Sequence, residues 1–177
     1  MGRLSGRRVL MVIAKEQFRD EEYAVPRRIL EQEGAVVTVA SSVTKPAKGM
    51  LGMTVTPDLT IDQADPKQFD AVIFVGGMGS TEYWDNPVAH RLARTTYDQG
   101  KVTSAICLAP MTLANAGLLT NKRATMWPSE SQQFKSKGVI YTGKPVERDG
   151  QVITGSGPEA AESFGRAVAD ALAASSS

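Results

Sequence analysis

The chain has only one cysteine and one histidine among its 177 residues. A single cysteine cannot form an internal disulfide, so oxidative folding is not implied. No apolar run is long enough to span a bilayer, and no hydrophobic secretory segment stands near the N-terminus, so we expect a cytoplasmic protein without a membrane partner. No histidine, cysteine or carboxylate cluster has metal-ligand spacing, and we predict neither a metal nor another cofactor.

An excess of charge of one sign is also missing. The formal net charge is +1, which gives no electrostatic case for nucleic acid as a partner. Hydrophobic residues make up 42% and charged residues 22%, as in an ordinary globular protein. The length suits one domain with its own core. We therefore predict a single domain over residues 1–177, with residues 1–6 and 175–177 loosely held.

Short apolar runs alternate with helical segments along the chain. Continuous apolar runs are typical of parallel strands covered on both faces. Such runs lie at residues 9–14, 35–40, 69–75 and 102–106, and helices are predicted at 20–33, 88–99, 109–116, 129–137 and 159–173. This alternation predicts an α/β sheet with helices on both faces.

Three details interrupt the pattern. Pro26 lies inside the first helical segment, so the regular helix either begins near Pro26 or is kinked in its first turns. Residues 43–65 are rich in proline and glycine, and we interpret them as a surface excursion that contains a small hairpin at residues 53–55. Asp149-Gly150 is predicted as a two-residue hairpin turn.

Cys107 stands where the fourth apolar run meets a helix. Ala105 and Ala109, two residues to either side, are small, as a sharp strand-to-helix turn requires. A thiol at a helix start is expected to favour the thiolate, because the helix dipole and free N–H groups stabilise negative charge. The alternative is a buried, inert cysteine.

Two further groups follow strand ends and should meet Cys107 at the carboxyl edge of the sheet. Gly76-Gly77 allows a turn whose N–H groups, with that of Leu108, would hold an oxyanion. The acidic run at residues 20–22 places a carboxylic acid near the thiol, where it would move a proton. The alternative is that these acids only favour the helix start.

The residues around these groups resemble the ThiJ/PfpI superfamily. Residues 105–110 resemble its nucleophile elbow, residues 74–77 its Gly-Gly turn and residues 154–158 the approach to its last helix. In its acidic segment a glutamate stands four residues before a proline, which selects Glu22 here. The resemblance covers residues 7–172. It implies a flavodoxin-like, class I glutamine-amidotransferase-like fold and a homodimer or larger homo-oligomer.

The sequence departs from the family pattern at the histidine. Many members have histidine directly after the cysteine or just before the proline of a Thr-x-x-Pro segment, where this chain has Leu108 and Trp127. His90 is interpreted as an ordinary helix residue, so no Cys-His dyad is expected. Trp127 is predicted to close the pocket beside Gly76 or to pack at a subunit contact, and Tyr83 and Trp84 to form a further wall.

The resemblance leaves three functional hypotheses. In the first, Cys107 attacks a small aldehyde or a glycated substrate, the Gly77 and Leu108 N–H groups hold the oxygen, and Glu22 moves the proton, as in a glyoxalase or deglycase. In the second, the protein is a redox sensor or chaperone in which Cys107 becomes a sulfinate bound to protonated Glu22. The third is a cysteine peptidase or isonitrile-hydratase-like hydrolase, which the missing histidine weakens most.

Overall fold

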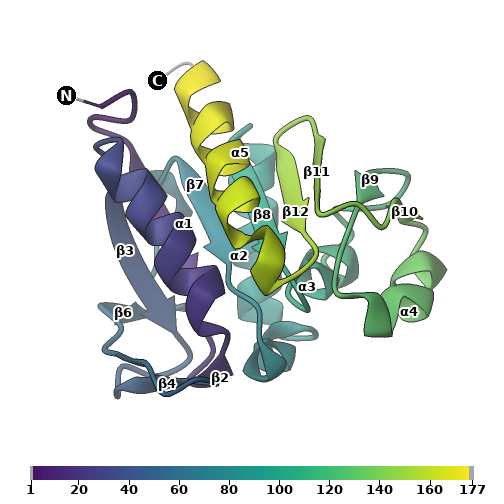
Figure 1. Cartoon of the computed structure of the whole chain (residues 1–177), viewed down its shortest axis with the longest axis horizontal. Helices are drawn as coiled ribbons and strands as arrows, with labels where there is room; N and C mark the ends of the chain where they lie inside the picture. Colours follow the sequence, from purple (N-terminus) through teal and green to yellow (C-terminus); the bar gives the residue numbers. More distant parts are fainter. Residues whose placement is uncertain (1, 176–177) are drawn as a thin grey trace.

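The centre of the molecule is a seven-stranded sheet in the order β11-β12-β8-β7-β1-β3-β6 (Figure 1). The computed structural model describes residues 2–175. Every neighbouring pair in this sheet is parallel except β11 and β12. The strands are β1 (Arg8–Val12), β3 (Val36–Ser41), β6 (Leu59–Thr60), β7 (Ala71–Phe74), β8 (Val102–Ile106), β11 (Val146–Asp149) and β12 (Val152–Gly155).

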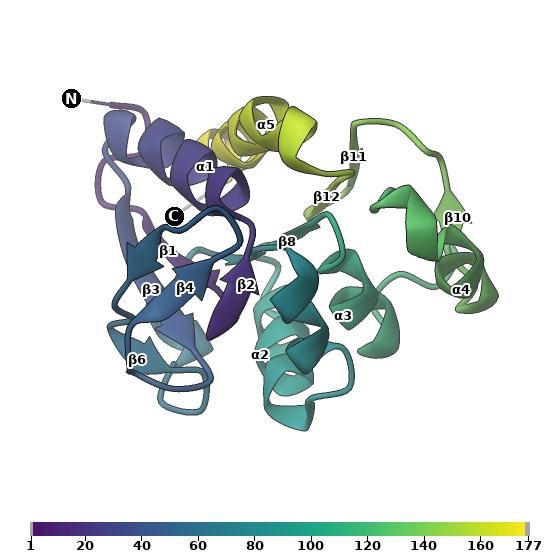
Figure 2. The same ribbon diagram turned by 60° about the horizontal axis from the view of Figure 1, so that its bottom comes forward.

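Helices cover both faces of the sheet, as the sequence predicts. Figure 2 shows α1 (Asp20–Gln32) and α5 (Ala161–Ala174) on one side, and α2 (Pro87–Asp98) and α3 (Pro110–Asn115) on the other. Alternate residues of β1 separate the two layers: Val9 and Met11 pack with the α1–α5 layer, and Leu10 and Val12 with the α2–α3 layer. None of the helices within residues 2–175 has the length and apolar content that a membrane span requires.

The helix α1 is continuous through its internal proline. It begins at Asp20, as the predicted range 20–33 has it, so the first of the two interpretations of Pro26, a regular helix that starts near the proline, is wrong. Three acidic residues in the first turn favour this earlier start through the helix dipole. Pro26 also packs closely on α5: a side-chain carbon placed on Gly165 would lie 3.0 Å from the Pro26 Cα. The glycine therefore allows the two helices to touch.

The surface excursion contains the predicted hairpin and a strand that the sequence does not reveal. The hairpin pairs β4 (Ala47–Gly49) with β5 (Thr54–Val55), and β2 (Glu16–Phe18) lies beside β4 in a small sheet. The Asp20 carboxylate accepts hydrogen bonds from the N–H groups of Leu51 (3.0 Å) and Met53 (2.9 Å). This contact fixes the hairpin tip to the start of α1. The missed strand is β6, at the edge of the main sheet.

Short elements complete the chain, and one turn differs from its prediction. In the β11–β12 hairpin Asp149 pairs with Val152, so the two turn residues are Gly150 and Gln151. Asp149 stays in the strand, where its carboxylate accepts a hydrogen bond from the Arg123 N–H (3.0 Å). The remaining elements are η1 (Pro66–Gln68), η2 (Met78–Tyr83), β9 (Arg123–Ala124), η3 (Pro128–Glu130), α4 (Ser131–Ser136), β10 (Ile140–Tyr141) and η4 (Pro158–Ala160).

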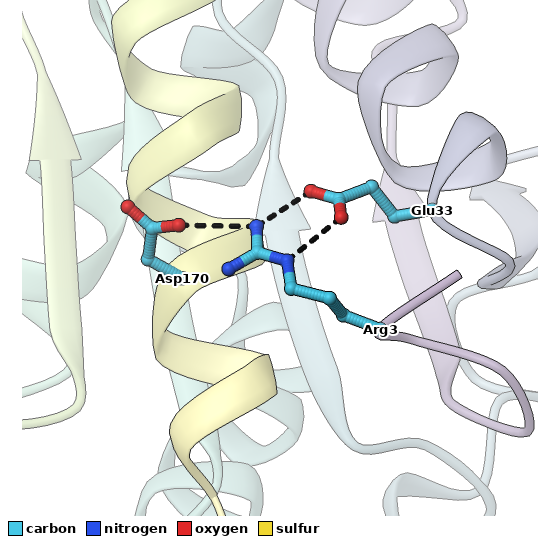
Figure 3. Close-up of polar contacts among 3 residues, drawn as sticks. All are labelled: Arg3, Glu33 and Asp170. Atoms are coloured by element: carbon cyan, nitrogen blue, oxygen red, sulfur yellow. Dashed lines mark hydrogen bonds and ion pairs between the residues drawn. The ribbon is translucent and has the colours of Figure 1, made fainter.

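The N-terminal segment is held more firmly than the sequence suggests. Leu4 is fully buried, and its N–H donates to the Glu33 carbonyl (2.8 Å). Arg3 donates two hydrogen bonds to the Glu33 carboxylate and one to Asp170 (Figure 3). The expectation that residues 1–6 are loose therefore does not hold for Arg3 and Leu4. Of the predicted loose tail, residues 176 and 177 lie outside the described residues.

Removing the buried leucine should weaken the fold measurably. We expect Leu4→Ala to lower the free energy of unfolding by about 2–5 kcal/mol, because it leaves a cavity in the α1–α5 layer. Arg3→Ala is the matched control and should have a much smaller effect, because exposed ion pairs contribute little. Urea denaturation of both variants measures the difference. Equal effects would show that Leu4 does not anchor the segment.

Candidate active site

Cys107 occupies the turn between β8 and α3 in a strained backbone conformation. Its φ angle is 67°, a region that residues with side chains rarely adopt. Its N–H donates to the Gly155 carbonyl (2.9 Å), and its own carbonyl accepts from the Trp127 N–H (2.8 Å). Ala105 and Ala109 are both buried, which agrees with the need for small residues on either side. The structure therefore contains the sharp strand-to-helix turn that the sequence predicts at Cys107.

Glu22 reaches the same place from the first turn of α1. Its side chain is completely buried. A side-chain carbon placed on Gly76 would lie 2.3 Å from the Glu22 Oε1 atom and 2.5 Å from the Cys107 Cβ atom. The carboxyl group and the cysteine therefore meet over the bare Cα of Gly76, and position 76 has no room for a side chain.

The neighbouring acids have different partners. Glu21 forms a bidentate ion pair with Arg19, at 2.8 and 3.0 Å. Asp20 holds the β4–β5 hairpin, as described above. Of the three acids, Glu22 is thus the one that packs beside Cys107, and both Asp20 and Glu22 contact groups outside the helix start.

Burial controls the charge of Glu22. Desolvation raises the pKa of its carboxyl to about 8, although the Cys107 thiol, the Arg19 charge and the Gly76 N–H all favour ionisation. Neither carboxyl oxygen has a hydrogen-bond partner of normal geometry, so these polar contacts are too weak to compensate for the burial. Glu22 therefore keeps its proton at neutral pH.

The Cys107 thiol does not have the low pKa that its position at a helix start suggests. Burial, and then the negative charge of an ionised Glu22, raise its pKa to about 12, while N–H groups of Gly77 and Leu108 act in the opposite direction. The α3 helix spans only six residues and the cysteine is 7% exposed, so helix-end stabilisation is outweighed by desolvation. At neutral pH Glu22 is protonated, and burial is then the main factor that opposes the thiolate.

A pocket of about 200 Å³ opens above the sulfur. Gly77, Leu108 and Trp127 line it, as the sequence predicts, whereas Gly76 packs beneath the Glu22–Cys107 contact. Trp127 is 42% exposed, and Gly157 leaves space for its ring: a side-chain carbon at Gly157 would lie 2.8 Å from the Trp127 Cε3 atom. The lining residues that the sequence did not reveal are Arg19, Met50, Met78 and Pro158.

A second, larger depression adjoins this pocket. Its volume is about 690 Å³, and it shares Arg19, Trp127 and Pro158 with the cysteine pocket. Cys107 does not line this depression, so a reaction at the thiol would take place in the smaller pocket. Sequence reasoning overlooked Arg19, although its position directly before the acidic run is a signal that a basic side chain stands near the site.

The predicted aromatic wall has a structural role instead. The Tyr83 hydroxyl is buried and donates to the Ile13 carbonyl (2.8 Å). The Trp84 Nε1–H donates to the Leu108 carbonyl (2.9 Å) and so supports the turn after the cysteine. The Nε2–H of His90 donates to the Trp84 carbonyl (2.7 Å), which agrees with an ordinary helix residue. None of these three residues lines the cysteine pocket.

The charge state of Glu22 leads to a prediction about stability. The unfolded chain releases the Glu22 proton near pH 4, at a usual pKa of about 4.3, whereas the folded protein keeps it up to about pH 8. Wild-type stability should therefore fall as pH rises between these values, by at most about 1.4 kcal/mol per pH unit. Glu22→Gln removes this titration, so its stability advantage over the wild type should grow with pH.

Urea denaturation at about pH 5 and about pH 8 measures this effect. Glu31→Gln, on an exposed position of the same helix, is the control and should follow the wild type. A constant difference between Glu22→Gln and the wild type at both pH values would show that Glu22 titrates normally.

Comparisons with known proteins agree with this architecture. The model of the DJ-1/PfpI family matches residues 7–171. An uncharacterised protein of Methanocaldococcus jannaschii is 42% identical, over 93% of this chain and 82% of its own length. A deglycase of Pyrococcus horikoshii is 32% identical, over 83% of this chain and 88% of its own.

Solved structures show the same fold. A ThiJ/PfpI domain protein of Brachyspira murdochii superposes with a TM-score of 0.94 at 29% identity, over 97% of this chain and 99% of its own. Drosophila melanogaster DJ-1beta superposes with a TM-score of 0.87 at 28% identity, over 99% of this chain and 92% of its own. The sheet is flavodoxin-like, as the family resemblance implies. From the extent of these matches, together with the elbow and its buried glutamate, the chain belongs to the DJ-1/PfpI family.

Proposed function

We propose that this chain is an enzyme that acts on small reactive carbonyl compounds through Cys107, as a glyoxalase or deglycase does. The contact between Cys107 and the buried Glu22 carries the proposal, because it joins a nucleophile to a group that moves a proton at near-neutral pH. Relatives named as a deglycase of Pyrococcus horikoshii and a glutathione-independent glyoxalase of Caenorhabditis elegans support it.

The first step is the addition of the thiol to an aldehyde. Ionised Glu22 accepts the proton of the Cys107 thiol while the sulfur bonds to the carbonyl carbon. The electron pair of the C=O π bond moves to the oxygen, where the N–H groups of Gly77 and Leu108 stabilise the negative charge. Glu22 then returns the proton to this oxygen, which gives a hemithioacetal with no net change in protons.

The pocket favours small substrates. Its volume of about 200 Å³ admits an aldehyde of a few carbon atoms, and the large side chains of Trp127 and Met78 are part of its wall. Its lining within the described part of the chain contains no histidine to protonate a leaving amine, so a peptidase is less well supported. We include in the proposal the cytoplasmic location and the homodimer or larger homo-oligomer that the family resemblance implies.

A redox sensor or chaperone is the second candidate. One observation favours it: the raised pKa keeps a proton on Glu22, and a neutral carboxyl can donate a hydrogen bond to a sulfinate on Cys107. In this role the carboxyl stabilises an oxidised cysteine and takes no part in turnover. The two candidates differ in what they require of Glu22.

Conversion of methylglyoxal to lactate tests the enzyme. We expect kcat/KM to rise about tenfold per pH unit below about pH 8 and to level off above it, because Glu22 must be ionised to accept the thiol proton. Cys107→Ala and Glu22→Gln should both abolish turnover, and Glu31→Gln should retain it.

Mass spectrometry of Cys107 after graded peroxide treatment separates the second candidate. The sensor is favoured over the enzyme if the wild type shows no turnover and the Cys107 sulfinate survives in Glu22→Gln but not in Glu22→Ala. If Glu22 variants changed neither turnover nor sulfinate formation, both roles assigned to Glu22 would be wrong.

A further inference from the structure

Two methionines that line the cysteine pocket are exposed to solvent, whereas three other methionines of the chain are completely buried. Met78 is 61% exposed and Met50 is 38% exposed, and both line the pocket with Cys107. Three other methionines are completely buried: Met11, Met111 and Met126. The thioethers of Met50 and Met78 are therefore open to oxidants in water, whereas those of the three buried methionines are not.

The backbone fixes both methionines in this position. Met50 lies at the tip of the β4–β5 hairpin, where its N–H donates to the Phe18 carbonyl (2.8 Å). Met78 begins η2 directly after Gly77, whose carbonyl accepts a hydrogen bond from the Ser80 hydroxyl (2.7 Å). The two side chains therefore reach the entrance from separate, hydrogen-bonded segments.

We propose that Met50 and Met78 form an oxidation site that controls access to Cys107. A peroxide transfers one oxygen atom to each thioether: a sulfur lone pair forms the S–O bond, the O–O bond breaks, and the peroxide leaves as water or an alcohol. The thioether is oxidised to a sulfoxide and the peroxide is reduced. This reaction needs no deprotonation, whereas Cys107 is 7% exposed and reacts as a thiolate.

The sulfoxides should open the pocket. A sulfoxide is polar, and keeping it inside a pocket that Leu108 and Trp127 also line is unfavourable. Each oxidised side chain should therefore turn toward water and leave the sulfur of Cys107 more accessible. Mild oxidation at the entrance would then increase the reactivity of the cysteine before the cysteine itself is oxidised. This inference does not depend on the carbonyl activity.

Limited treatment with hydrogen peroxide, followed by peptide mass spectrometry, tests the site. We expect Met78 and Met50 to form sulfoxides well before the buried Met11, Met111 and Met126, which serve as controls within the same sample. The measurement should give the same order in Cys107→Ser, because the thioethers react directly with the peroxide.

The effect on access is read from the rate at which iodoacetamide labels Cys107 before and after mild oxidation. The wild type should be labelled several-fold faster after oxidation. Met50→Leu with Met78→Leu keeps the apolar volume but cannot be oxidised, so its rate should not change. Met78→Leu alone, at the more exposed position, should lose part of the increase and provides a test if the double variant is unstable.

Two results would overturn the proposal. One is oxidation of Met50 and Met78 no faster than that of the buried methionines, which would mean that a partner covers the entrance. The other is an unchanged labelling rate after both sulfoxides have formed, or the same change in the leucine variant. Loss of methylglyoxal turnover would leave these measurements unaffected, so the two proposals can fail separately.

Discussion

The main physical constraint on this site is the burial of one carboxyl group beside one thiol. Glu22 and Cys107 come from different elements, α1 and the β8–α3 turn, and they meet only because Gly76 has no side chain. An uncompensated carboxyl in this position opposes folding whenever it is ionised, since water no longer solvates it. The same desolvation raises the pKa of Glu22 into the range where it can exchange a proton near neutral pH.

The rest of the fold holds this unfavourable contact in place. Packing of Pro26 on Gly165 fixes α1 against α5, and the Asp20 carboxylate ties the start of α1 to the hairpin that carries Met50. On the other side, the hydrogen bond from Trp127 to the Cys107 carbonyl joins the pocket wall to the elbow. The strain at Cys107 and the burial of Glu22 are therefore supported by contacts from several elements, as expected for a site whose residues are held rigidly.

Much of the fold follows from local sequence, and the site follows only in part. Apolar runs and glycine positions predict the strands and helices because both are local properties. Small residues around Cys107 predict the elbow. The pKa of the thiol and the position of Met50 were not predictable, because they depend on how deeply the cysteine is buried and on where a hairpin tip is fixed. Leu4 is a further example: its burial depends on a contact with Glu33, distant in sequence.

The central claim is that Glu22 is buried and protonated at neutral pH, and its pKa can be measured directly. NMR titration of isotope-labelled glutamate carboxyl carbons, with Glu22→Gln to assign the signal, follows this group through its ionisation. The account predicts a midpoint of about 8 in the wild type, and a higher one in Cys107→Ala, which loses the polar contact with the thiol that favours the ionised carboxyl. A midpoint near the usual value of about 4.3 would contradict it.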